Sequence, residues 1–108
     1  MPDDYFTITR APAVDGAAPD RVLLAGDLDM GARDELRDTL VAAAGETTGP
    51  RLVVDLRQVR FIDSEAISAI LEGYLAAERA GLDFRLTGAL GIVRRVFDVI
   101  GLDHLFLE

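Results

Sequence analysis

Ser64 stands between two carboxylates, Asp63 and Glu65, shortly after an apolar run that predicts a buried strand. Asp63 lies where a helix needs its N-cap, so Ser64 falls at about the first helical position. Ligands of α/β proteins gather beyond the carboxyl ends of parallel strands, and this hydroxyl therefore lies where function is commonly placed. By residue type alone, a helix cap followed by an ordinary first-turn serine explains the pair as well. The chemistry to test first is nucleophilic catalysis.

The rest of the sequence offers little support for catalysis. A serine nucleophile needs an imidazole base, and the only histidine, His104, lies in an apolar, strand-like segment near the C-terminus. Among 19 acidic residues, two neighbouring carboxylates more often form a solvated face than an acid–base pair. The chain has no cysteine for a thiol nucleophile or a zinc site. We therefore expect no enzyme, no metal and no cofactor.

Glycine patterns that hold phosphate groups are also missing. Without lysine the chain has no GxxxxGK motif, and no GxGxxG follows a predicted strand. The turn from Gly88 to Gly91 carries two glycines before a predicted helix, which is a weak signal for anion binding. An enzyme or nucleotide-binding protein would have to use this turn and its nearby acids without lysine, cysteine or a suitably placed histidine.

Length and charge predict one acidic domain over residues 1–108. The chain has 11 basic and 19 acidic residues and a formal net charge of −8. This charge repels phosphodiester backbones, so nucleic acid is not an expected partner, whereas a basic protein surface is. The N-terminus lacks the basic and apolar regions of a signal peptide, and no window approaches the roughly 18 apolar residues of a membrane span. We expect a cytoplasmic monomer with no membrane contact.

The hydrophobic pattern predicts strands and helices in a regular order. Strands at 5–10 and 21–25 flank a loop-like stretch at 11–20, which predicts an N-terminal hairpin. Further strands are predicted at 52–56, where both faces should be covered, at 82–87, and within 104–107. Helical spacing predicts helices at 31–44, 63–80 and 90–100, and residues 57–61 are interpreted as a short connection.

The predicted fold class is α/β, since strands and helices alternate after the hairpin. We expect a single domain with a mixed sheet of four to five strands, three main helices and repeated right-handed β-α units. The strand order does not follow from the sequence.

Three segments carry a specific pattern of residues. VVDLRQVRFIDSEAI at 53–67 is similar to D-L-x-x-V-x-F-I-D-S-S/T-G-L, and GDLD at 26–29 is similar to a G-E/D-L/I-D turn after a second strand. RRVFDVIGL at 94–102 is similar to h-x-R-h-F-x-h-x-G-L, where h is any apolar residue. Taken in chain order, 26–29, 53–67 and 94–102, the segments resemble the STAS domain of bacterial anti-sigma factor antagonists over nearly the whole chain. The resemblance implies a STAS-like fold.

The resemblance also implies a binding switch without catalysis by this chain. In that family, the unphosphorylated antagonist binds an anti-sigma factor that is also a serine kinase, and this frees a sigma factor. The kinase uses ATP to phosphorylate the serine that corresponds to Ser64, and a serine phosphatase restores the active form. The implied partner surface comprises Gly26, Asp27, Leu28, Asp29, Asp63, Glu65, Ala66 and Ile67.

Two residues beside the serine depart from the family pattern. Glu65 replaces the usual Ser or Thr and places a fixed negative charge at the acceptor, although acids also stabilise the first turn of a helix. Ala66 replaces the usual Gly, and its methyl group is a potential obstruction to a close-fitting partner.

Three interpretations of Glu65 are open. A kinase with a matching basic pocket accepts it, or it partly mimics the phosphorylated state, or the serine is no longer used. We favour the first. Under the third, the chain is a diverged, constitutively binding STAS subunit of a larger complex, stressosome-like or dedicated to lipid transport.

Overall fold

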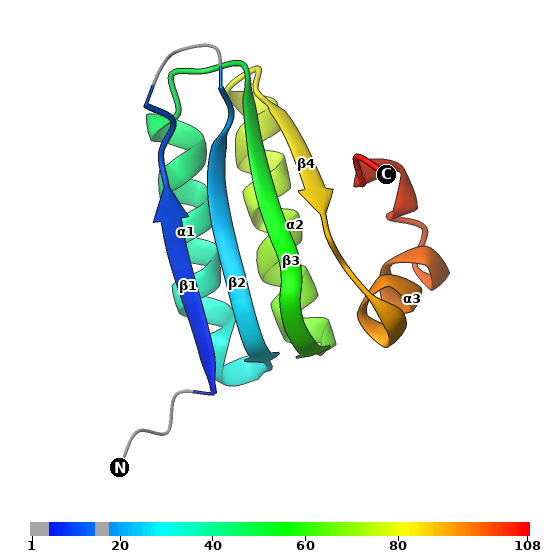
Figure 1. Ribbon diagram of the computed structural model, residues 1–108. Coiled ribbons are helices and arrows are strands. Elements are labelled where there is room, and N and C mark those ends of the chain that lie inside the picture. The colour runs from blue at the N-terminus through cyan, green and yellow to red at the C-terminus, as the bar shows by residue number, and fades with distance from the viewer. Residues whose placement is uncertain (1–4, 15–17) are drawn as a thin grey trace.

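Up to the third long helix, strands and helices follow one another in the order that the sequence predicts (Figure 1). The computed structural model describes residues 5–14 and 18–108. Parts of the predicted loop at 11–20 and of the predicted domain at 1–108 therefore lie outside the described residues. The elements are β1 (Phe6–Ala11), β2 (Asp20–Leu28), the 3-10 turn η1 (Met30–Ala32), α1 (Arg33–Glu46), β3 (Arg51–Ile62), α2 (Ser64–Arg79), β4 (Asp83–Thr87), α3 (Gly91–Val99) and the 3-10 turn η2 (Asp103–Leu105).

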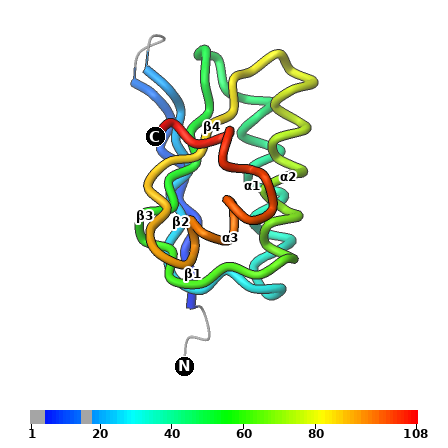
Figure 2. Tube along the Cα trace, turned by 90° about the vertical axis from the view of Figure 1, so that its right-hand side faces the viewer, coloured from blue at the N-terminus to red at the C-terminus, as the bar shows by residue number. Residues whose placement is uncertain are grey.

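The four strands form one mixed sheet in the order β1-β2-β3-β4. β1 pairs with β2 antiparallel, as the predicted hairpin requires, and β2, β3 and β4 are mutually parallel. Figure 2 shows that α1 and α2 cover the same face of this sheet, while α3 lies on the β4 side. The α/β class and the mixed sheet are thus confirmed, with the lower of the two predicted strand numbers.

The other face of the sheet carries no helix among the described residues. β3 is nevertheless covered on this face at Val53, which is buried, as the prediction of a strand covered on both faces requires. Val53 lies in register between Arg21 of β2 and Arg85 of β4. The aliphatic stems of the two arginines flank it, and ion pairs to Asp55 and Asp83 hold their charged ends.

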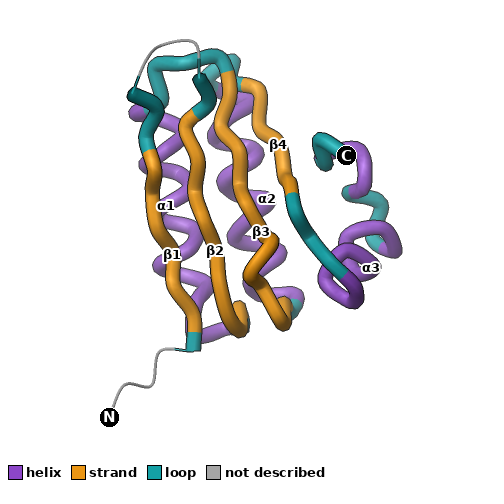
Figure 3. Tube along the Cα trace, in the orientation of Figure 1, coloured by secondary structure: helices purple, strands orange, loops and turns teal. Residues whose placement is uncertain are grey.

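β3 continues to Ile62, so the prediction of a connection at 57–61 is wrong (Figure 3). The register between β2 and β3 shifts twice, and each shift places one extra residue in β3. The buried residues Leu56, Val59 and Ile62 therefore recur at intervals of three. Because buried residues do not alternate with exposed ones at this interval, the segment does not show the period of two that indicates a strand.

The predicted strand within 104–107 is also wrong. In its place, η2 is followed by a single parallel bridge between Leu86 and Phe106, and the Leu107 amide donates to the Leu86 carbonyl at 2.9 Å. The Arg94 guanidinium lies 4.1 Å from the centre of the Phe106 ring. The C-terminal residues therefore cover part of the outer edge of β4.

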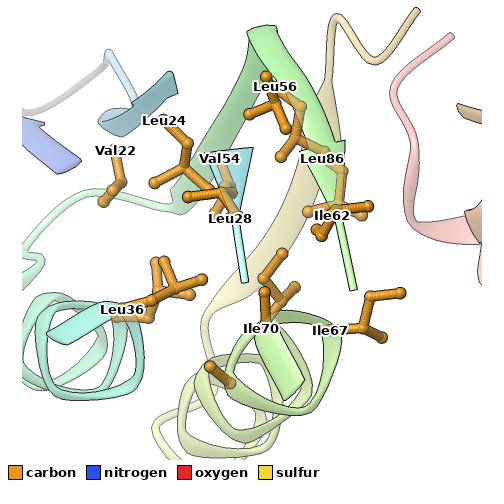
Figure 4. Packing of buried hydrophobic residues seen from close by; sticks show 14 of the residues in the cluster. Val22, Leu24, Leu28, Leu36, Val54, Leu56, Ile62, Ile67, Ile70 and Leu86 are labelled. Atoms are coloured by element: carbon orange, nitrogen blue, oxygen red, sulfur yellow. The ribbon is translucent and has the colours of Figure 1, made fainter. Parts of the chain in front are cut away.

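The core fills the space between the sheet and the two long helices (Figure 4). Side chains of β2 and β3 meet those of α1 and α2, among them Val22, Leu24, Leu28, Leu36, Val54, Leu56, Ile67 and Ile70. The helices approach each other closely at Gly73, where an added Cβ atom would lie 2.6 Å from the Leu40 Cβ. This contact sets how closely α1 and α2 approach each other near their middles. In the described part of the chain, no helix has the length and apolar character of a membrane span.

Candidate functional site

Asp63 caps α2, as the sequence predicts. Its backbone is extended, with φ −111° and ψ −179°, and its Oδ1 accepts a hydrogen bond of 3.0 Å from the Ala66 amide. The Asp63 amide donates to the Leu28 carbonyl at 3.1 Å, which joins the end of β3 to the end of β2. Ser64 is the first residue of α2 and is exposed. The fold therefore presents the hydroxyl at the carboxyl ends of two parallel strands.

Residues 26–28 complete β2, which corrects the expectation of a turn at this point. Gly26 has φ +89°, and an added Cβ atom would lie 1.9 Å from the Tyr5 carbonyl oxygen. The Asp27 amide donates to that same oxygen at 2.8 Å. Asp29 then caps η1, since its Oδ1 accepts from the Gly31 amide at 2.9 Å. Gly26 and Asp29 thus shape the path of the chain into α1.

An ion pair joins the first turns of α1 and α2. The Arg33 Nη1 lies 2.7 Å from the Glu65 Oε1, and the Arg33 Nε lies 3.1 Å from the Asp34 Oδ1. The hydrogen bond to Glu65 is the largest of the contacts that raise the pKa of Arg33 above its usual value. The negative charge of Glu65 beside Ser64 is therefore partnered.

Arg33 was not among the residues predicted for this site, although one signal was present. A cation at the first position of a helix faces the positive end of the helix dipole, and such a residue needs a compensating anion. Its nearest partner in the sequence is Asp34, and the pairing with Glu65 follows only from the fold.

Three of the predicted partner-binding residues have buried side chains, namely Leu28, Ala66 and Ile67. They support the surface from the core and do not themselves face a partner in this conformation. The Ala66 methyl group is fully buried, so it does not obstruct an approach to Ser64. Asp29 and Ser64 are exposed, and the remaining predicted residues, Gly26, Asp27, Asp63 and Glu65, are half-buried.

One exposed apolar side chain at this end of the molecule was also not predicted for the site. Met30, directly after Asp29, is 69% exposed, and it belongs to η1, which contacts α2. We refer to seven accessible residues of this region as the Ser64 face: Asp27, Asp29, Met30, Arg33, Asp63, Ser64 and Glu65. Beside them, the exposed Arg60 pairs with Asp27 at 3.5 Å.

The other candidate sites are not assembled. Across residues 5–14 and 18–108, no group of His, Cys, Asp or Glu is arranged to hold a metal ion. At the glycine turn, the chain's own Glu108 takes the place expected for an anion. Its carboxylate accepts from the Thr87 hydroxyl at 2.6 Å and from the Gly88 amide at 3.4 Å. The hydrogen bond from Thr87 is the main reason that the pKa of Glu108 lies below its usual value.

These features define an α/β domain that exposes a serine at a capped helix N-terminus. A family model described as "Mlab, STAS domain" matches residues 14–108, and the chain belongs to this STAS domain family. The resemblance found in the sequence is thereby confirmed. Comparison with curated proteins gives no match.

Solved structures of anti-sigma factor antagonists share the fold. Unphosphorylated SpoIIAA superposes with a TM-score of 0.79 at 20% identity, over 94% of this chain and 86% of that one. An anti-sigma factor antagonist from Mycobacterium paratuberculosis gives 0.78 at 27% identity, over 99% and 86%. Phosphorylated SpoIIAA, a Bacillus cell fate determinant, gives 0.69 at 18% identity, over 94% and 89%.

Proposed function

We propose that this chain is an anti-sigma factor antagonist that phosphorylation of Ser64 switches off. When unphosphorylated, it binds an anti-sigma factor that is also a serine kinase and thereby frees a sigma factor, and a serine phosphatase reverses the modification. The observation that carries the proposal is the exposed Ser64 at the start of α2, directly after its Asp63 cap. The fold shared with SpoIIAA, which is known in unphosphorylated and phosphorylated forms, supports it.

The partner binds the Ser64 face. The face combines one exposed apolar side chain, Met30, with carboxylates at Asp27, Asp29 and Asp63. An acidic face of this kind suits a basic partner surface, in line with the net charge of −8. The chain itself acts by binding and contributes no catalytic group.

The modification is a phosphoryl transfer in which the kinase supplies the catalytic groups. The Ser64 Oγ attacks the γ-phosphorus of ATP and gives its proton to a base of the kinase. The bond from the γ-phosphorus to the bridging oxygen breaks, and ADP leaves. An exposed hydroxyl at the first helical position permits this approach, because no part of α2 precedes it.

Phosphorylation changes the charge of the face and leaves the fold in place. A phosphoserine adds about −1.5 to −2 charges at neutral pH. The N-terminus of α2 favours a negative charge by roughly 0.3–1 kcal/mol, so the domain does not need to unfold. A partner that fits against a small neutral hydroxyl then meets a bulky dianion. A loss of about 2.8 kcal/mol weakens binding roughly a hundredfold.

Intact mass spectrometry tests the proposal. The chain is incubated with ATP and each candidate anti-sigma kinase of its organism, alongside Ser64→Ala and Ser68→Ala variants. Ser68 is the matched control, since it is exposed on the same helix one turn away. We expect a gain of one phosphoryl group, about 80 Da, that Ser64→Ala abolishes and Ser68→Ala retains. A complex that persists with ATP and without any mass gain would instead identify a constitutively binding STAS subunit.

A further inference from the structure

Glu65 places a negative charge next to Ser64, and this charge affects the site both before and after phosphorylation. It directly follows Ser64 in the first turn of α2. An unpaired carboxylate there would repel an acidic or phosphate-bearing group as it approached the hydroxyl. In the structure, however, Glu65 pairs with Arg33 at 2.7 Å, and the side chains of both residues are 43% exposed.

Arg33 is held at this point by more than one contact. It is the first residue of α1 and follows η1, which turns the chain from the end of β2 into the helix. Its Nε also bonds to the Asp34 Oδ1 at 3.1 Å, and Arg37 approaches the same oxygen at 3.5 Å. The guanidinium is therefore oriented across the two helix N-termini and still reaches solvent.

We propose that Arg33 neutralises Glu65 while Ser64 is unmodified and becomes the counter-ion of the phosphoryl group once Ser64 is phosphorylated. Arg33 is thus a positioning residue of the switch. The proposal rests on the proposed function only for the enzymes that modify Ser64. The change of the Arg33 partner from Glu65 to the phosphoryl group does not depend on which enzyme acts.

The exchange follows from the chemistry of the groups. A guanidinium binds phosphate oxygens bidentately, and a dianion attracts it more strongly than a carboxylate does. The phosphoryl group would appear one residue away from the present partner of Arg33. Because the Arg33 side chain is partly solvated, it turns without opening the core.

The charges of the face differ clearly between the two states. Before modification, Arg33 and Glu65 sum to zero and Ser64 is neutral. Afterwards, the phosphoryl group brings about −2, Arg33 partly offsets it, and Glu65 loses its partner. Glu65 therefore contributes an unpaired charge only in the phosphorylated state. This favours the interpretation in which a kinase accepts Glu65 over the one in which Glu65 permanently mimics phosphate.

Phosphorus NMR on a chain with phosphoserine at position 64 tests the exchange without a kinase. The phosphoserine is incorporated during translation, and its second ionisation is followed by the ³¹P chemical shift between about pH 4 and 9. The parent is compared with Arg33→Gln. Arg37→Gln is the matched control, because it removes the same charge one turn further along α1, from a side chain that pairs with Asp34 and Asp38.

A cation beside the phosphate favours its dianionic form. We therefore expect the titration midpoint of Arg33→Gln to lie higher than that of the parent by about 0.3 pH units or more, the scale of a partly exposed pair, and Arg37→Gln to follow the parent. Equal midpoints in Arg33→Gln and Arg37→Gln would overturn the proposal. If Arg33→Gln does not fold by circular dichroism, Arg33→Lys replaces it. We then expect its midpoint to lie above those of the parent and Arg37→Gln, because lysine keeps the charge without the bidentate fork.

The result is independent of the proposed function. If no kinase modifies Ser64 but the midpoints differ as expected, the proposed function fails and the role of Arg33 stands. If a kinase modifies Ser64 and the midpoints coincide, the proposed function stands and the role of Arg33 fails.

Discussion

Gly26→Ala, which adds one methyl group beside the Ser64 face, tests the close backbone contact between Gly26 and Tyr5. In Gly26→Ala, the new Cβ atom would lie 1.9 Å from the Tyr5 carbonyl oxygen, well inside van der Waals contact. The residue would also have to keep φ at +89°, which L-residues with a side chain avoid. Since the contact is with backbone, no side-chain rotation relieves it. Either β1 or the end of β2 must move.

The expected cost comes from two contributions. The left-handed conformation costs roughly 1–2 kcal/mol for a residue with a Cβ atom. Separating the strands weakens the hydrogen bond from the Asp27 amide to the Tyr5 oxygen, worth about 0.5–1.5 kcal/mol. We therefore expect Gly26→Ala to lower the free energy of unfolding by about 1.5–3.5 kcal/mol. In a domain of this size, the melting temperature should fall by roughly 6–28 °C.

Gly45→Ala is the matched control for this measurement. Gly45 lies in α1 with no atom near its potential Cβ, and its φ is not positive. The same chemical change should stabilise the protein there by about 0.5–1 kcal/mol. Urea unfolding followed by circular dichroism compares both variants with the parent. A Gly26→Ala variant that unfolds within about 0.5 kcal/mol of the parent would refute the reasoning, because the strands would then have absorbed the methyl group without strain.

Three further predictions concern the cap, an acidic network and the partner surface. Asp63→Ala should lower the free energy of unfolding by about 1 kcal/mol, whereas Asp63→Asn keeps a capping oxygen and should stay near the parent in urea unfolding; equal losses would contradict the capping role. Burial alone would raise the pKa of Asp83, but hydrogen bonds from Arg51 and Arg85 outweigh it and hold this pKa below its usual value. The stabilisation from Asp83 is thus present at neutral pH and is lost as the pH falls through the folded-state pKa. Asp83→Asn should therefore be less stable than the parent near pH 7, and the difference should shrink as the pH falls through that pKa; a difference that does not shrink in acid would argue against this. Met30→Ser should weaken binding of the anti-sigma factor at least fivefold, about 1 kcal/mol, in titration calorimetry, with an unchanged melting temperature, and unaltered affinity would remove Met30 from the interface.

The elements with regular patterns were predictable from the sequence. The helix over Ser64–Arg79 was expected within one residue at each end, because its apolar stripe and its Asp63 cap are local signals. The fold class followed from the alternation of strands and helices. Both depend on neighbours in the chain, which a sequence shows directly.

The parts that were missed depend on partners far away in the chain. The end of β3 looked like a connection because two bulges replace alternation with buried residues at Leu56, Val59 and Ile62. The ion pair of Arg33 with Glu65 joins residues 32 positions apart. The helix capping was thus predictable, and the charge balance around Ser64 was not, because it depends on how α1 and α2 pack.

The close approach of α1 and α2 at Gly73 also has an evolutionary consequence. A side chain at position 73 would collide with Leu40, and the two helices could then be accommodated only farther apart. Any such drift would separate the first residues of the helices and lengthen the contact across them. Among relatives that retain a basic residue at 33 and an acidic one at 65, positions 40 and 73 should therefore vary together, with a larger residue at one matched by a smaller residue at the other.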